Sequence, residues 1–585
     1  MTVTNGGRPR PGPARTEPAA EDAWLRCDGC GALVYGRKFD RNLKVCPDCG
    51  HHGRLTVWER LELLLDPGSL RRFGETVRST DLLGFTDTKP YPQRLAENRS
   101  RTGNPAAAVC GHARVEDRPV VVAALDFAFL GGSIGAAVGE LVARAARTAL
   151  HDRVPLVIIS ASGGARMQEG AISLMQMAKT SQELNRLHAA GILVVNLNLN
   201  PTFGGATASF SMLGDVIIAE PGARIGFAGP QVIRQTIRQE LPQGFQTAEY
   251  LLDNGQIDMV VPREGLRAML GRVLRLHAPR PRRRAPQDEG RPPAATVTDP
   301  AELAERPAAD VVARARSVER PTTLDYCAYM FGDFVELHGD RARGDDPAVV
   351  GGLADLDGRT VVVIGHQKGH DVAEMVRRNF GMPHPWGYQK AYRLMQYAAR
   401  FGFPLVTFVD TPGAYPGIEA ESNGQAFSIA RCLERMSDLP VPVVSVVTGE
   451  GGSGGALALA VANRVLILDS AYFSVISPEG CSTILFGSAE AAPRAAEQLR
   501  LTPPDLLRLG VVDGVIREPG EGAHAEHLAT ADRIKAALLE GLDELDALSA
   551  REGPGALVEA RYRRYARFGD PAGITTIEDR DHGRR

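Results

Sequence analysis

One strand–loop–helix pattern occurs twice in the chain, about 250 residues apart, and this duplication limits the fold more than any other feature. The segment VPLVIISASGGARMQEG at 154–170 matches FPLVTFVDTPGAYPGIE at 403–419. In the same order, ILVVNLNLNPTFGGATASFSMLGDVIIAEP at 192–221 matches VPVVSVVTGEGGSGGALALAVANRVLILDS at 441–470. Both copies alternate β-branched strand runs with helical patterns. We therefore predict two copies of one α/β domain.

The second copy contains a glycine-rich stretch that fits three different functions. It spells G-x-G-x-x-G (Gly449, Gly451, Gly454), as in dinucleotide-binding units, and G-x-S-x-G around Ser453, as in hydrolases. When the copies are aligned on their Gly-Gly pairs, Ser453 falls opposite Phe203 and the dinucleotide fingerprint has no counterpart. What the copies share is a Gly-Gly pair after one strand and small residues after the preceding strand. This favours the third function, a backbone that stabilises negative charge.

These shared junctions predict backbone hydrogen-bond donors for an oxyanion in each copy. Glycine lets the backbone approach a ligand closely, and the start of a helix directs unpaired N–H groups and partial positive charge at it. Close packing of helix on strand by small residues is the structural alternative. The predicted donors are the N–H groups of Gly163, Gly164, Gly204 and Gly205 in the first copy and of Gly413, Ala414, Gly454 and Gly455 in the second.

Four of the eight cysteines form two C-x-x-C pairs near the N-terminus: Cys27, Cys30, Cys46 and Cys49. This spacing is typical of a tetrahedral zinc site made of thiolates. Four sulfur ligands leave no position open for a substrate, so we expect one structural Zn²⁺. Redox dithiols or disulfides are the alternative, which a reducing cytosol disfavours. The other four cysteines are expected to be buried as small apolar side chains.

Composition excludes several classes of protein. A chain of 585 residues exceeds what a single hydrophobic core supports, so at least two domains are expected. The net charge of -3 gives no overall attraction to nucleic acid or to an anionic membrane. No apolar run reaches the length of a membrane span, and the N-terminal segment lacks the apolar core of a signal peptide. We therefore expect a cytoplasmic protein.

Several long motifs closely resemble the carboxyltransferase component of bacterial acetyl-CoA carboxylase. The predicted zinc ribbon, FLGGSIGAAVGE at 129–140 and SASGGARMQEG resemble its beta subunit. TLDYCAYMFGDFVELHGDRARGDDP, RRNFGMPHPWGYQKAYRLM and SVISPEGCSTILF resemble its alpha subunit. The resemblance covers roughly 27–258 and the chain from 321 to the C-terminal helices, so the chain looks like a beta–alpha fusion. It departs from the family in being one polypeptide and in its Arg/Pro-rich connection.

The resemblance implies two crotonase-like (ClpP/crotonase) domains in tandem after a small zinc ribbon. Each domain would consist of β-β-α units stacked as a spiral. The expected organisation is a disordered tail at 1–22, the zinc ribbon at 23–58, a beta-like domain at 59–274, a flexible linker at 275–305, an alpha-like domain at 306–570 and a charged tail at 571–585.

The resemblance also implies a reaction, the transfer of a carboxyl group from carboxybiotin to acetyl-CoA. The product is malonyl-CoA, in the first committed step of fatty acid synthesis. Biotin arrives on the biotin carboxyl carrier protein, which is an expected partner together with biotin carboxylase. The thioester oxygen and the biotin ureido oxygen both become negative, which agrees with two oxyanion holes. We expect a homodimer that binds no membrane.

Two alternatives remain open from the sequence. A carboxyltransferase for propionyl-CoA or another acyl-CoA is the nearer one. A nucleic-acid-binding protein that uses the basic residues of the zinc ribbon is the more distant one. Four basic residues could contact CoA phosphates or the transferred carboxylate, and each is explained equally well as an ordinary surface or ion-pair residue. They are Arg166, Lys368, Lys390 and Arg393.

Overall fold

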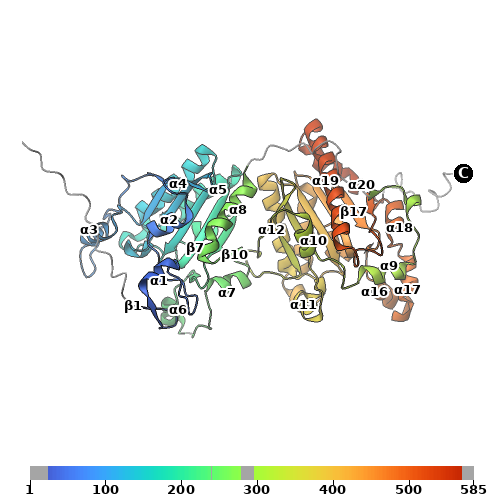
Figure 1. The fold of residues 1–585 in the computed structure, drawn as a ribbon, viewed down its shortest axis with the longest axis horizontal. Helices are drawn as coiled ribbons and strands as arrows, with labels where there is room; N and C mark the ends of the chain where they lie inside the picture. The colour runs from blue at the N-terminus through green and yellow to red at the C-terminus, as the bar shows by residue number, and fades with distance from the viewer. Residues whose placement is uncertain (1–23, 239, 279–295, 570–585) are drawn as a thin grey trace, which may run out of the picture.

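The computed structural model describes residues 24–238, 240–278 and 296–569, which form two similar α/β halves and a small N-terminal ribbon (Figure 1). In Figure 1 the halves lie side by side along the long axis, the first in blue to green and the second in yellow to red. The predicted tails at 1–22 and 571–585 lie outside the described residues, as does the stretch 279–295 of the predicted linker.

The ribbon is an antiparallel pair of short strands followed by one helical turn and a half. Its elements are β1 (Trp24–Arg26), β2 (Leu33–Tyr35) and α1 (Gly36–Arg41). Cys27, Val34 and Cys46 are buried together with Phe39 packed against them. The ribbon therefore has a small core of its own, separate from those of the two halves.

The first half contains an eight-stranded sheet in the order β10-β8-β7-β6-β5-β4-β3, with β9 paired to the end of β7. The strands from β5 to β10 run parallel, and β3 and β4 complete an antiparallel edge. The strand bounds are β3 (Arg71–Phe73), β4 (Ala108–Val115), β5 (Arg118–Leu125), β6 (Leu156–Ser162), β7 (Val194–Phe203), β8 (Val216–Ala219), β9 (Ile225–Gly226) and β10 (Met259–Val260).

The second half repeats this sheet in the order β11-β19-β17-β16-β15-β14-β13-β12, with β18 paired to the end of β16. The repeat confirms the predicted duplication, and β11 is an additional edge strand. The strand bounds are β11 (Thr296–Val297), β12 (Phe334–Glu336), β13 (Val349–Leu356), β14 (Arg359–His366), β15 (Leu405–Thr411), β16 (Val443–Gly452), β17 (Arg464–Leu468), β18 (Tyr472–Ser474) and β19 (Gly514–Ile516).

Helices connect the strands, and their apolar faces cover the sheets. In α4, for example, Val138, Leu141, Val142 and Ala145 are all buried, a spacing of three and four residues that places them on one face. No helix in the described part of the chain has both the length and the apolar character needed to cross a bilayer. The helices of the first half are α2 (Val57–Leu64), α3 (Tyr91–Thr102), α4 (Ala136–Asp152), α5 (Gly170–Ala189), α6 (Pro230–Ile237), α7 (Ala248–Asp253) and α8 (Leu266–His277). Those of the second are α9 (Ala308–Ala315), α10 (Thr323–Met330), α11 (Val372–Arg377), α12 (Pro385–Phe401), α13 (Ile418–Ser422), α14 (Gln425–Asp438), α15 (Ser453–Leu457), α16 (Pro478–Cys481), α17 (Ala492–Gln498), α18 (Pro503–Arg508), α19 (His527–Glu552) and α20 (Gly555–Ala566).

The strand register moves the alignment of the two copies by one residue. The first residue of β6 pairs with the first residue of β7, and β15 pairs with β16 in the same way. Since β7 and β16 both contain 10 residues, Gly204 corresponds to Ser453 and Gly205 to Gly454. The sequence alignment paired identical Gly-Gly letters, whereas the structure pairs the residues that form the same turn after the strand. Gly204 (φ +61) and Ser453 (φ +57) both adopt the left-handed conformation directly after the strand.

Regular structure occupies both ends of the range predicted as a flexible linker, 275–305. Helix α8 continues to His277, whose ring lies 2.6 Å from the hydroxyl of Tyr397, and Arg275 pairs with Asp333. On the other side, β11 pairs antiparallel with β19 and extends the second sheet. The prediction rested on Pro and Arg content, and composition does not indicate whether a segment pairs with residues far away in the sequence.

The two halves contact each other where parallel strands of the first half begin. Asp215, directly before β8, pairs with Arg400, and Asp258, directly before β10, lies 3.1 Å from Arg393. Both acids are fully buried, and the largest apolar cluster runs through both halves. The halves are therefore joined by ion pairs and a continuous core. Consequently, the ends of β6 and β7 face away from the second half of the same chain.

Candidate functional site

In the first half, the predicted glycines meet at the ends of β6 and β7. A Cβ built on Gly204 would lie 3.2 Å from the Cα of Gly164, and Gly164 itself has φ +111, so a side chain at either position would be strained. The N–H groups of Gly163, Gly164 and Gly204 each donate to an oxygen atom of the protein, at 2.8, 3.1 and 2.9 Å. These three predicted donors are already used within the fold.

Two neighbouring backbone N–H groups at this junction remain unpaired among the described residues. The N–H groups of Ala165 and Gly205 have no acceptor among the described residues. They are adjacent, because a Cβ built on Gly205 would lie 3.4 Å from the nitrogen of Ala165. Ala165 escaped the sequence analysis, which searched the first copy for glycine pairs. The signal was present, since Ala414 was identified at the corresponding position of the second copy.

The second half repeats the arrangement at the ends of β15 and β16. Gly413 donates its N–H to Thr411 Oγ1 at 3.0 Å, whereas Ala414 has no acceptor in the described chain. Gly454 and Gly455 lie in the first turn of α15, where N–H groups have no partner within the helix. A Cβ on Gly455 would lie 2.4 Å from the Ala414 nitrogen, so Gly455 is required for packing. By strand register Gly454 corresponds to Gly205, and Gly455 is the residue that lies against Ala414.

A buried ion network supports the strands that carry the second junction. Lys368 Nζ lies 2.7 Å from Asp410 Oδ1, near the end of β15, and 2.7 Å from Glu450 Oε2, near the end of β16. Arg316 and Tyr472 also donate to Glu450, at 2.8 and 2.7 Å. Burial alone would raise the pKa of Glu450, but the charge of Lys368 and these hydrogen bonds lower it to about 2. The charged carboxylate therefore stays in place near neutral pH.

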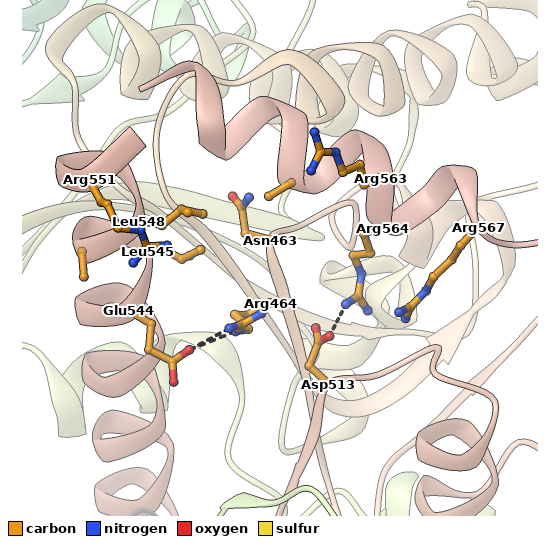
Figure 2. A pocket seen from close by; sticks show the side chains of 12 residues that line it. Asn463, Arg464, Asp513, Glu544, Leu545, Leu548, Arg551, Arg563, Arg564 and Arg567 are labelled. Carbon is orange, nitrogen blue, oxygen red and sulfur yellow. Dashed lines mark hydrogen bonds and ion pairs between the residues drawn. The ribbon is translucent and has the colours of Figure 1, made fainter. Parts of the chain in front are cut away.

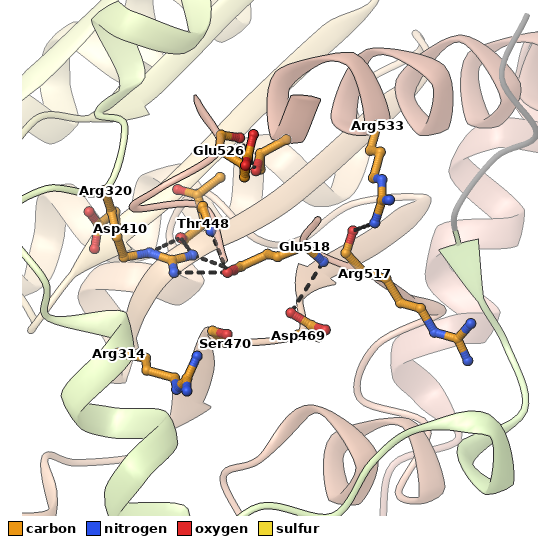
Figure 3. A network of polar contacts seen from close by, with 12 residues as sticks. Arg314, Arg320, Asp410, Thr448, Asp469, Ser470, Arg517, Glu518, Glu526 and Arg533 are labelled. Atoms are coloured by element: carbon orange, nitrogen blue, oxygen red, sulfur yellow. Dashed lines mark hydrogen bonds and ion pairs between the residues drawn. The ribbon is translucent and has the colours of Figure 1, made fainter. Parts of the chain in front are cut away.

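A second network, shown in Figure 3, joins the next strand ends. Arg320 donates to the carbonyl oxygen of Thr448 at 2.8 Å and to Glu518 at 2.6 Å. Asp469, directly after β17, accepts from the backbone N–H of Glu518 at 3.3 Å. Burial opposes ionisation of Glu518, but the charge of Arg320 holds its pKa below the usual range. The ends of β16, β17 and β19 are thus fixed to one another.

The basic residues considered for phosphate contacts are all engaged inside the protein. Arg166 lies 3.2 Å from Glu169 and Lys390 lies 2.7 Å from Asp345, and both basic side chains are fully buried. Lys368 and Arg393 have the carboxylate partners described above. We assign none of these four residues to a CoA phosphate.

The ribbon places four cysteine sulfurs in position for one zinc ion. The four Sγ atoms all lie within 4.8 Å of one another, with 3.7 Å between Cys27 and Cys49 and 3.9 Å between Cys30 and Cys46. In a tetrahedron with Zn–S bonds of about 2.3 Å, the sulfurs are about 3.8 Å apart. The distances fit Zn²⁺ with all four positions filled by protein, as a structural site requires.

The ribbon docks on the first half through a buried charged cluster. Glu220, directly after β8, pairs with Arg263 at 2.9 Å and with Arg60. Arg263 also donates to the carbonyl oxygens of Leu43 at 2.6 Å and Gly53 at 2.9 Å. Although burial opposes ionisation, hydrogen bonds and the two arginine charges hold the pKa of Glu220 well below its usual range. Because β7 and β8 run parallel, their C-terminal ends lie on the same side of the sheet. The ribbon therefore lies on the side that carries the first junction.

Replacing one zinc ligand is expected to unfold the ribbon alone. Cys27→Ser should release zinc, because binding of the metal and folding of such a ribbon are one process. The two halves should keep their thermal transition, since their cores exclude the ribbon. Metal analysis and thermal unfolding measure both effects. Cys481→Ser, at a buried cysteine outside the ribbon, is the control and should keep full zinc. Full zinc in Cys27→Ser would contradict the four-ligand site.

Known proteins match the ribbon and both halves. Residues 303–569 match the family model "Acetyl co-enzyme A carboxylase carboxyltransferase-like", and residues 24–49 match "Acetyl-CoA carboxylase zinc finger domain". A protein of Saccharopolyspora erythraea named acetyl-coenzyme A carboxylase carboxyl transferase subunits beta/alpha is 62% identical over 566 residues, which is 96% of this chain and 98% of that protein. A Thermus thermophilus protein named as the alpha subunit is 60% identical over 255 residues, 44% of this chain and 80% of that protein.

Solved structures match the fold over most of the chain. The crystal structure of transcarboxylase 12S with methylmalonyl-coenzyme A aligns with a TM-score of 0.64 at 24% identity, covering 86% of this chain and 92% of that one. A single-chain, multi-domain long-chain acyl-CoA carboxylase aligns with a TM-score of 0.65 at 20% identity, covering 86% of this chain and 47% of that one. These matches confirm the predicted fold class, two crotonase-like halves in tandem.

Proposed function

Because the chain belongs to the family of acetyl-CoA carboxylase carboxyl transferases with joined beta and alpha subunits, we propose that its two backbone junctions are the oxyanion holes of this reaction. The enzyme forms malonyl-CoA from acetyl-CoA. One observation carries the proposal: Ala165 and Gly205 in one half, and Ala414 and Gly454 in the other, hold N–H groups without an acceptor in the described chain. Two matched pairs of donors suit a reaction that creates two oxyanions.

The chemistry needs little beyond these donors. The bond between the carboxyl carbon and the biotin ureido nitrogen breaks, and a bond forms to the methyl carbon of acetyl-CoA. Negative charge develops on the ureido oxygen and on the thioester oxygen of the enolate. The ureido nitrogen accepts the methyl proton, so no separate Ser/His/Asp constellation is required. We assign the thioester oxygen to Ala165 and Gly205, and the ureido oxygen to Ala414 and Gly454.

We further propose a homodimer in which the first junction of one chain faces the second junction of its partner. The first junction lies across β7 from the second half of its own chain, a span of about 30 Å for a strand of 10 residues. Exposed apolar side chains lie near both junctions. Met167 and Ile418 follow Ala165 and Ala414 closely in the sequence, and Phe227 and Val475 directly follow β9 and β18, which pair with the ends of β7 and β16. Apolar side chains gathered in this way mark a docking surface.

The carboxyl donor in this proposal is biotin on the biotin carboxyl carrier protein, which biotin carboxylase charges. The test is carboxyl transfer from the carboxylated carrier protein to acetyl-CoA or propionyl-CoA, with acyl-CoA products quantified by mass spectrometry. We expect kcat/KM to be at least about tenfold higher for acetyl-CoA, since one methylene group changes discrimination by that order. A higher kcat/KM for propionyl-CoA would support the alternative function, a propionyl-CoA carboxyltransferase. No product with either would contradict the proposed function.

A further inference from the structure

A hollow of about 640 Å³ opens between helices α19 and α20 on the surface of the second half (Figure 2). Its polar lining is dominated by arginine, and Leu545 and Leu548 form an apolar wall. Two carboxylates, Asp513 and Glu544, also line it. The arginines are Arg464, Arg551, Arg563, Arg564 and Arg567.

The hollow lies at the opposite edge of the sheet from the second junction. Arg464 is the first residue of β17, and Asp513 directly precedes β19. Ala414 and Gly454 instead follow the ends of β15 and β16, which run parallel to β17 and β19. The hollow is therefore separate from the proposed oxyanion hole.

Positive charge exceeds negative charge within this hollow. Arg464 pairs with Glu544 at 2.8 Å and Arg564 pairs with Asp513, which uses both lining carboxylates. Arg567 donates to a backbone carbonyl oxygen at 2.8 Å and forms no ion pair with any residue that the structure describes. The guanidinium group of Arg567 carries five N–H donors, so most of them remain free for a ligand.

The C-terminal end of α20 and the residue after it contribute three of the arginines that line the hollow. Arg564 and Arg567 are three residues apart and their side chains point the same way, whereas the side chain of the adjacent Arg563 points away from them (Figure 2). Arg563 is 76% exposed, and among the described residues its ion-pair partner is Glu559 of the same helix, a contact of small net value that a ligand can replace. Arg564 is buried, and its Nε has no hydrogen-bond partner in the described chain.

We propose that this hollow binds a small organic diphosphate. The planar guanidinium groups of α20 match phosphate oxygens in geometry and charge. The leucine wall receives the organic part, and the volume lies within the range of small-molecule sites. This binding is independent of carboxyl transfer, because no residue of the hollow belongs to the junctions.

The test is isothermal titration calorimetry of the full chain at low salt with ADP, pyrophosphate and adenosine as probes. We expect saturable binding of ADP, weaker binding of pyrophosphate and no measurable binding of adenosine. The double variant Arg563→Gln/Arg567→Gln should weaken ADP binding at least tenfold, since two charge-assisted contacts are lost. Both side chains are exposed, so the thermal transition and carboxyl transfer should be unchanged.

Arg186→Gln is the matched control, because Arg186 is also an exposed helix arginine paired with a carboxylate of its own helix. Its affinity for ADP should equal that of the unmodified chain. The proposal is overturned if neither ADP nor pyrophosphate binds at millimolar concentration, or if adenosine binds as tightly as ADP. It is also overturned if ADP binding survives the double substitution and is displaced by acetyl-CoA, which would place the ligand in the substrate site.

Discussion

Proline at position 414 is expected to lower the turnover of carboxyl transfer by about a hundredfold. Ala414→Pro deletes one N–H group proposed to hold the ureido oxygen, and a single oxyanion-hole donor contributes about 3 kcal/mol. The preceding residue is Gly413, which restricts the added ring least. The KM for acetyl-CoA should change little, because the donor acts on charge that develops in the transition state. Steady-state kinetics measure the effect, and circular dichroism confirms the fold.

Ser453→Gly is the control for this experiment. Ser453 occupies the left-handed turn of the second junction, where the first junction has Gly204. Glycine adopts this conformation without strain, so the substitution removes the hydroxyl group and keeps the turn. Turnover should remain close to that of the unmodified enzyme. A folded but inactive Ser453→Gly would restore the serine nucleophile of the hydrolase interpretation and refute the role of the backbone.

Two inactive chains refolded together are expected to recover about a quarter of full activity. Gly205→Pro disables the first junction of one chain, and Ala414→Pro disables the second junction of the other. If each active site takes one junction from each chain, half of the dimers are mixed, and one of their two sites is intact. The contacts of Asp215 and Asp258 support the proposed crossed arrangement, because they turn the first junction away from the second half of its own chain.

The alternative arrangement gives a different result in the same experiment. If each chain builds its active sites from its own two halves, every site in the mixture contains a defect, and activity stays at the level of the separate variants. Each variant refolded alone is the control, and size-exclusion chromatography establishes that dimers have formed in all three samples. Recovery of activity in either single variant would point to incomplete inactivation.

The features that the sequence predicted well are those encoded by neighbouring residues. The zinc ligands follow from two C-x-x-C pairs, because each pair closes within a single turn and the Sγ distances leave little freedom. The duplicated sheet follows from two long segments that share their order of strands and loops. Both conclusions depend on local spacing and on repetition, which are visible in the letters.

The features that escaped prediction depend on distant partners. Gly163 and Gly204 look like free donors in the sequence, yet their N–H groups donate to the carbonyl oxygens of Gly131 and Phe227. Ser453 takes a conformation that usually belongs to glycine, so matching identical letters displaced the alignment by one residue. Residue type indicates where a backbone can bend. It does not indicate which amides remain unpaired after the sheet, turns and neighbouring loops have formed.

The continuous core between the halves changes what the peptide connection contributes. Buried ion pairs at Asp215 and Asp258 and the shared apolar cluster join the halves in addition to the peptide connection. A separately synthesised alpha polypeptide, such as the Thermus thermophilus protein, is similar to the second half alone. In the joined chain, association of the two halves is intramolecular, so it does not weaken when the protein is diluted. Synthesis of a single polypeptide then delivers the two halves in a strict one-to-one ratio, without matched expression of two genes.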